Sequence, residues 1–228
     1  RAVQGKARVL VRLLVAFIFG LFVGLPAASQ WSNWMLFRHQ QSFGIKDPQF
    51  NTDIGFYVFR LPFLQYLVGW LFGAVVLATI LTAVAHLLNG GIRPQAVGNR
   101  LSTQAKVHLS VLLAIMALLR AASYWLTRFD LTRSTRGVVQ GATYTDVKAQ
   151  LPATNLMILV SIAVALLLLW NVRQRGWRLP VMALGLWVVV ALIAGTVYPA
   201  IIQRIVVQPN VSTRELPYIQ RNIDATRA

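Results

Sequence analysis

The chain has 228 residues, of which 57% are hydrophobic and only 12% are charged. A soluble domain carries about twice that share of charged residues, so the composition is typical of a membrane protein. Lysine and arginine number 22 against 6 acidic residues. Such an excess would suit a nucleic-acid binder, but the apolar runs leave little room for a soluble domain with a basic face. The sequence has no cysteine, which excludes disulfides, thiolate metal sites and cysteine nucleophiles.

Five stretches are long and apolar enough to cross a bilayer, which takes about 20 residues of helix. They are residues 9–28, 61–88, 107–126, 151–170 and 179–202. The sequence therefore predicts an all-α, polytopic bundle of transmembrane helices over residues 1–202, with five spans. The first stretch ends in an Ala-x-Ser pattern, so a cleaved signal peptide is the alternative for it. Pro62 and Pro152 are expected in the first turns of their helices, where the missing N–H costs nothing.

The loops between the spans fall into two groups that differ in charge. One group, residues 1–12, 89–106 and 171–180, holds no acid, and its basic residues are Arg1, Lys6, Arg8, Arg12, Arg93, Arg100, Lys106, Arg173, Arg175 and Arg178. The other group, residues 29–60, 127–150 and 203–228, holds every acid: Asp47, Asp53, Asp130, Asp146, Glu215 and Asp224. The positive-inside rule then predicts a cytoplasmic amino end and an extracytoplasmic carboxyl end.

The acid-containing segments are expected to carry the interfacial structure. In residues 29–60, Trp31, Trp34 and Met35 recur at helical spacing and predict a helix at the membrane surface beyond Pro26. Residues 127–150 are also expected at the interface, as a short hairpin or an ordered loop. Residues 203–228 are predicted to be an extracytoplasmic linker into a domain absent from this chain, which we expect to be a piece of a longer protein.

Pairs of small residues four apart occur within three spans, and such spacing lets helix backbones approach closely in lipid. The pairs are Gly20 and Gly24, Gly69 and Gly73, and Ala191 and Gly195. We predict that they pack helices of this chain together, with oligomerisation or a partner helix as the alternative.

Arg120 is the one Lys, Arg, Asp or Glu between residues 107 and 126. Side chains on a helix lean toward its amino end, which for Arg120 is back into the membrane. Arg120 is therefore the candidate for a buried charge, paired with Asp130 or another carboxylate of the outer loops, or with an anionic lipid or ligand. The alternative is that its side chain snorkels to the membrane surface. Arg60 leans outward, toward a lipid phosphate or a carboxylate.

The other polar residues have simpler interpretations. His39, His86 and His108 are scattered without neighbouring carboxylates, so no metal site is expected. Asp47 in KDPQ and Asp53 in NTD are predicted to be helix N-caps rather than a catalytic pair. No span contains Asp or Glu, which disfavours a self-contained ion-coupled carrier.

Several strings carry a resemblance in combination: FGIKDPQFNTDIGFYVFRLPF, GGIRP, AASYWLTRFDL, YTDVKAQLPA and YPAIIQRIVVQPN. With them the chain resembles, from about residue 30 onward, the large bacterial membrane proteins of uncharacterised protein family 0182, found mainly in actinobacteria and cyanobacteria. The resemblance implies two further membrane helices before the first residue and a large extracytoplasmic domain after the last. It brings no established activity, so no functional residue is transferred.

The sequence thus favours an anchor or scaffold in a multi-pass protein of the plasma membrane, part of a larger cell-envelope protein. Its partners would be the bilayer, including anionic lipid, and partner membrane proteins or further copies of itself, with no nucleic acid and no cofactor. The alternative is a transport or lipid-handling component whose helices feed the extracytoplasmic domain. An enzyme is less favoured, because no phosphate loop and no convergent nucleophile, base and oxyanion set occurs.

Overall fold

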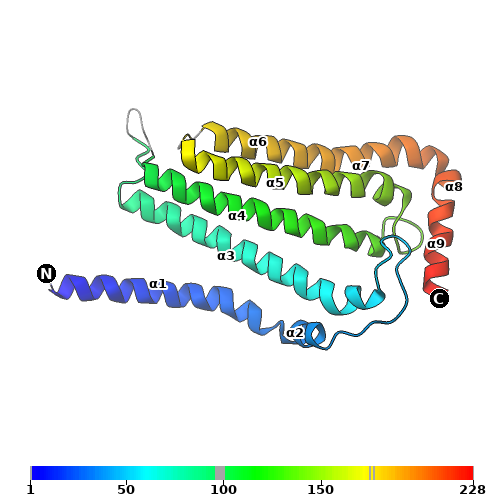
Figure 1. Ribbon diagram of the computed structural model, residues 1–228, viewed down its shortest axis with the longest axis horizontal. Helices are drawn as coiled ribbons and strands as arrows, with labels where there is room; N and C mark the ends of the chain where they lie inside the picture. Colours follow the sequence, from blue (N-terminus) through cyan, green and yellow to red (C-terminus); the bar gives the residue numbers. More distant parts are fainter. Residues whose placement is uncertain (1, 96–100, 175, 177, 228) are drawn as a thin grey trace.

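The computed structural model describes residues 2–95, 101–174, 176 and 178–227. Within these ranges the chain is mostly helical and forms no strand, which confirms the all-α prediction. Four long helical stretches lie side by side (Figure 1). By length and composition each can cross a membrane: Phe56–Leu88, Thr103–Arg133, Asp146–Gln174 and Arg178–Arg214. A fifth span is possible if α1 (Ala2–Ala28) and α2 (Trp31–Arg38), bent by 53° from each other, act as one.

Three of these stretches contain a proline directly after a widened, π-helical turn. η1 (Phe56–Arg60) leads into Pro62 of α3 (Leu61–Leu88), and η3 (Asp146–Gln150) leads into Pro152 of α5 (Leu151–Gln174). In the last stretch, η4 (Ile193–Val197) separates α6 (Arg178–Leu192) from α7 (Tyr198–Ile201), which contains Pro199.

Proline explains these turns because it has no N–H and its ring clashes with the carbonyl four residues earlier. The helix widens around the clash instead of ending. As expected, Pro62 and Pro152 lie in the first turns of α3 and α5, but neither helical stretch begins there. Helical structure already runs from Phe56 and from Asp146, and the α-helical geometry resumes at Leu61 and Leu151.

The long helices pack in chain order, α3 on α4 (Thr103–Thr127), α4 on α5, and α5 on α6. The seam between α4 and α5 is built from small buried side chains, which are Ser110, Ala114, Ala117 and Ala121 on α4 and Ser161 and Ala165 on α5. Small residues let the two backbones approach closely where lipid gives no hydrophobic drive to associate. Leu168 and Ala183 complete this core on the side of α6.

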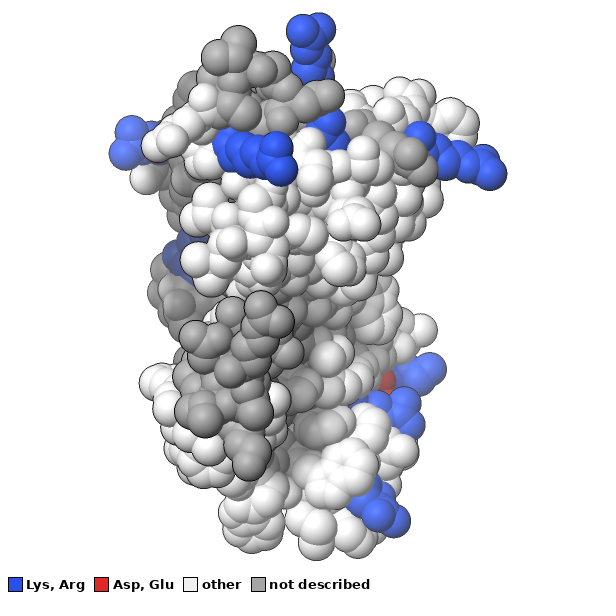
Figure 2. Space-filling view, turned by 90° about the vertical axis from the view of Figure 1, so that its left-hand side faces the viewer, with Lys and Arg blue, Asp and Glu red and all other residues white. Residues whose placement is uncertain are grey.

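The two loop groups lie at opposite ends of the bundle (Figure 1). The connections α3–α4 and α5–α6 lie at one end, called here the basic end, where Figure 2 shows Lys and Arg around the face and almost no acid. All six acids belong to segments of the other end, called here the α9 end. Arg1, Arg100 and Arg175 of the predicted basic group lie outside the described residues. Which end faces the cytoplasm stays a prediction.

The α9 end carries the remaining helices. They are η2 (Arg128–Arg133), η5 (Ile202–Val207), η6 (Gln208–Asn210), α8 (Val211–Arg214) and α9 (Leu216–Arg227). The segment that the sequence presented as a linker is thus helical through Arg227. Its last helix, α9, runs across the ends of the long helices rather than along them (Figure 1). Residues 134–142 form an ordered loop and not a hairpin.

Candidate functional site

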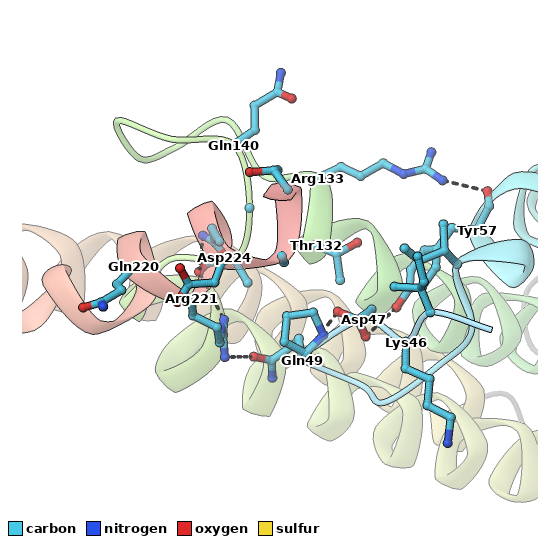
Figure 3. Close-up of a pocket in the computed structure, with 18 of the residues that line it drawn as sticks. Lys46, Asp47, Gln49, Tyr57, Thr132, Arg133, Gln140, Gln220, Arg221 and Asp224 are labelled. Carbon is cyan, nitrogen blue, oxygen red and sulfur yellow. Dashed lines mark hydrogen bonds between the residues drawn. The ribbon is translucent and has the colours of Figure 1, made fainter. Parts of the chain in front are cut away.

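A cavity of about 720 Å³ lies at the α9 end, which is within the size range of ligand pockets. Figure 3 shows its walls, which come from residues 45–57, η2, the loop at 140–142 and α9. Apolar side chains, among them Ile45, Ile54 and Pro217, line much of it. Its cations are Lys46, Arg133 and Arg221, and its acids are Asp47 and Asp224.

Asp47 organises the near wall of this cavity. Its carboxylate accepts hydrogen bonds from the backbone N–H groups of Gln49 at 2.9 Å and Phe50 at 2.6 Å, and from the Tyr57 hydroxyl at 3.0 Å. Residues 48–50 form a turn and not a helix. The predicted helix cap is therefore wrong: Asp47 closes a turn, where an aspartate satisfies the same kind of backbone donors.

Asp53 does cap a helix, the turn that begins at Ile54. Its carboxylate accepts hydrogen bonds from the N–H of Gly55 at 2.7 Å, the Ser42 hydroxyl, and the N–H groups of Phe43 at 3.2 Å and Gly44 at 3.1 Å. The hydrogen bond from Ser42, followed by those from the backbone, lowers the pKa of Asp53 to about 2. This carboxylate stays ionised and fixes the loop that precedes the long helix.

Two arginines join the separate walls of the cavity. Arg133 of η2 donates to the carbonyl of Tyr57 at 2.7 Å. Arg221 of α9 donates to the Gln49 side chain at 2.8 Å and reaches the carbonyl of Ala142 at 3.4 Å. Figure 3 draws the side chains of Arg133 and Arg221, with Arg221 extending from α9 toward Gln49. These hydrogen bonds therefore join segments of the cavity wall that are distant in sequence.

Further polar contacts fasten α9 to the loop beside the cavity. The Asn222 amide donates to the carbonyl of Ala142 at 3.3 Å, and Glu215, just before α9, accepts from the N–H of Tyr144 at 3.1 Å. The ring of Tyr218 meets that of Tyr144 edge-on at 5.9 Å. Burial raises the pKa of the Tyr218 hydroxyl. Glu215 and Asn222 are both buried, so these contacts are shielded from water.

The chemistry that this site offers is limited. Asp47 and Asp53 are occupied by backbone donors, so neither is free to serve as a general base. Within the described residues no three His, Asp or Glu side chains converge as metal ligands. The cavity can hold a ligand or an apolar segment beside its cations.

The three candidate charges lie apart. Asp130 accepts from the Gln65 amide at 2.9 and 2.8 Å. Arg60 donates to the Gln40 side chain and is exposed. Arg120 is half-buried, with its guanidinium carbon 5.5 Å from the Phe72 ring centre and 5.2 Å from that of Tyr124. No carboxylate of the described chain lies within 4.0 Å of Arg120, so the suggested ion pair with Asp130 is not made.

The glycines of the predicted small-residue pairs have no close neighbour within the described chain. A Cβ built at Gly20, Gly24, Gly69, Gly73 or Gly195 would meet nothing within 4 Å. The close approach instead involves the alanine and serine seam between α4 and α5. The sequence contains a pattern that could have predicted this seam, because small residues recur on one face of α4: Ser110, Ala114, Ala117 and Ala121. Whether the glycine pairs and Ala191 pack against another chain stays a prediction.

The structure brings together two histidines that the sequence left apart. His86 Nε2 and His108 Nδ1, on α3 and α4, lie 3.3 Å apart at the basic end. This distance lets one imidazole ring donate a hydrogen bond to the other.

Comparisons with known proteins agree on one family. The family model described as uncharacterised protein family UPF0182 matches residues 1–228. The protein FRAAL6027 of Frankia alni is 49% identical over 96% of this chain, and Francci3_3781 of Frankia casuarinae is 47% identical over 100%. SCO5204 of Streptomyces coelicolor is 38% identical over 93%. The chain spans 21% and 22% of the length of the two Frankia proteins. No solved structure matches this chain.

Proposed function

Because this chain belongs to the uncharacterised protein family UPF0182, and spans about a fifth of the length of its curated relatives, we propose that it anchors a larger envelope protein in the plasma membrane. In this role the long helices hold the protein in the bilayer, and the α9 end serves as a scaffold for parts that lie outside the membrane. Docking of partner membrane proteins belongs to the same proposal.

The observation that carries this proposal is the fastening of α9. Arg221, Asn222 and Glu215 tie this region to two different loops, and Glu215 and Asn222 are buried. α9 also lies across the bundle rather than continuing the last span (Figure 1). A segment attached to such a helix would leave the membrane surface in a fixed direction. This favours a rigid connection to the rest of the protein over a flexible linker.

The test uses the full-length protein in liposomes loaded with calcein and a pH-sensitive dye. We expect neither calcein release nor proton flux above that of empty liposomes. We also expect mild crosslinking of native membranes to capture envelope components at the α9 end. Specific flux, or a protein that is purified alone after crosslinking, would contradict an anchor.

A transport or lipid-handling role is the second candidate, and Arg120 is the observation that favours it. A half-buried cation in a span, without a carboxylate partner in the described chain, is often functional. Under this alternative, Arg120→Ala abolishes flux or lipid transfer while the protein unfolds at an unchanged temperature. The anchor proposal instead predicts no activity for the variant to lose.

A further inference from the structure

Arg120 lies inside a predicted membrane span. It is seven residues from the end of α4 at Thr127, which corresponds to roughly 10 Å along the helix axis. A guanidinium at such a depth is costly unless its donors find partners. Arginine does not lose its proton in proteins, so the charge must be accommodated.

The described chain gives this cation aromatic faces but no acceptor. Phe72 of α3 and Tyr124 of α4 flank the guanidinium. All six acids of the chain are described, and the one ion pair among the described residues joins Arg136 to Asp146. A ring face attracts the charge without accepting the N–H groups at the edge of the guanidinium. Those donors still need an oxygen acceptor.

A second arginine lies farther along the same side of the helix. Arg128 is the first residue of η2, which continues α4 without a break. Residues 120, 124 and 128 are spaced by four, so they lie on successive turns of one side. The Arg128 guanidinium carbon is 5.1 Å from the centre of the Trp125 ring and 4.9 Å from that of Phe129. Its Nε is buried without a hydrogen-bond partner in the described chain. Two cations without carboxylate partners, lined with aromatic rings, therefore lead from the span to the α9 end.

We propose that this face of α4 binds the phosphate of an anionic membrane lipid, with Arg120 as the principal donor. The planar guanidinium fork matches two oxygens of a phosphate. Arg128 adds charge nearer the membrane surface, where aromatic side chains commonly settle. A lipid with net negative charge is preferred over a zwitterionic one, because it brings no cation of its own toward the two arginines.

The test compares lipids retained by the full-length protein. Wild type and Arg120→Met are reconstituted in nanodiscs with equal amounts of phosphatidylcholine and phosphatidylglycerol, and the lipids that remain after purification are counted by mass spectrometry. We expect wild type to enrich phosphatidylglycerol roughly tenfold, as a charge-assisted contact worth about 1.4 kcal/mol would give. Arg120→Met should return to the bulk ratio.

Three controls keep the outcome decisive. Arg60→Met, which removes an exposed cation outside this face, should keep the enrichment. If Arg120→Met does not fold, Arg120→Lys should fold and show partial enrichment, because lysine keeps the charge but lacks the fork. Inorganic phosphate added to phosphatidylcholine nanodiscs should not raise the unfolding temperature. Wild type without enrichment, enrichment lost only in Arg60→Met, or stabilisation by free phosphate would each overturn the proposal.

Discussion

At the scale of single residues, Asp53 links loop structure to pH. Its pKa in the folded protein is about 2 against an ordinary value of 3.8. The stabilisation of the folded protein by the ionised Asp53 carboxylate is therefore complete above about pH 4, and it is lost as the pH falls toward 2. We expect Asp53→Asn to lower the unfolding temperature at pH 7, and the difference from wild type to shrink between pH 4 and pH 2.

Asp146, in contrast to Asp53, is a buried carboxylate. It is 1% exposed and accepts from the N–H and hydroxyl of Thr143 at 3.1 and 2.8 Å and from Arg136 at 3.0 Å. Asp146→Asn leaves buried donors facing an amide, and should lower the free energy of unfolding by about 2 kcal/mol. Arg136→Ala should cost below about 1 kcal/mol, because this arginine is 38% exposed. Unfolding of the detergent-solubilised protein by added SDS measures both changes. A loss for Arg136→Ala as large as that for Asp146→Asn would contradict the predicted difference between the exposed and the buried partner.

At the scale of elements, the α4–α5 seam depends on small side chains. Ala165 is fully buried there. Ala165→Leu forces the helices apart and should cost about 1–3 kcal/mol. Gly73→Ala is the matched control on α3, since a Cβ at Gly73 meets nothing within 4 Å. It should raise stability by about 0.5–1 kcal/mol, as expected for glycine replaced in an open helix interior. A loss of stability at Gly73 would instead indicate a helix from another chain packed on that face.

Gly141 determines how closely α9 approaches its loop. Its φ of 135° suits glycine, and a Cβ there would overlap the Asn222 side chain. Gly141→Ala should therefore loosen α9, with amide hydrogen exchange in Leu216–Arg227 faster by about tenfold, or about 1.4 kcal/mol. Asn222→Ala, which removes one hydrogen bond, should have a smaller effect. Unchanged exchange in Gly141→Ala would show that α9 is not fastened here.

The elements also differ in how well the sequence predicts them. A span must be apolar along its whole length, so hydropathy located all four long helices of the structure. The starts of two of these helices, at Phe56 and Asp146, were not predicted. Polar residues and a proline near each start are typical of a helix end, whereas here the helix widens and continues. The docking of α9 was missed for a different reason. Its contact between Arg221 and Gln49 joins residues 172 positions apart, and no local pattern encodes such a pairing.

At the scale of the whole molecule, the separation of loops into two ends makes orientation testable. The loops of the basic end carry no acid in their sequence, and all six acids lie toward the α9 end. Retention of basic loops in the cytoplasm predicts that the α9 end is outside. The chain has no cysteine, so single cysteines can report each side once any in the rest of the protein are replaced.

Thr135→Cys and Thr103→Cys are suitable reporters, because both threonines are exposed and lie at opposite ends. In intact cells a membrane-impermeant maleimide should label Thr135→Cys and leave Thr103→Cys unmodified until the membrane is permeabilised. The reverse pattern would invert the topology. It would also place the 720 Å³ cavity and the fastened α9 in the cytoplasm, and the anchor would then hold cytoplasmic rather than envelope components.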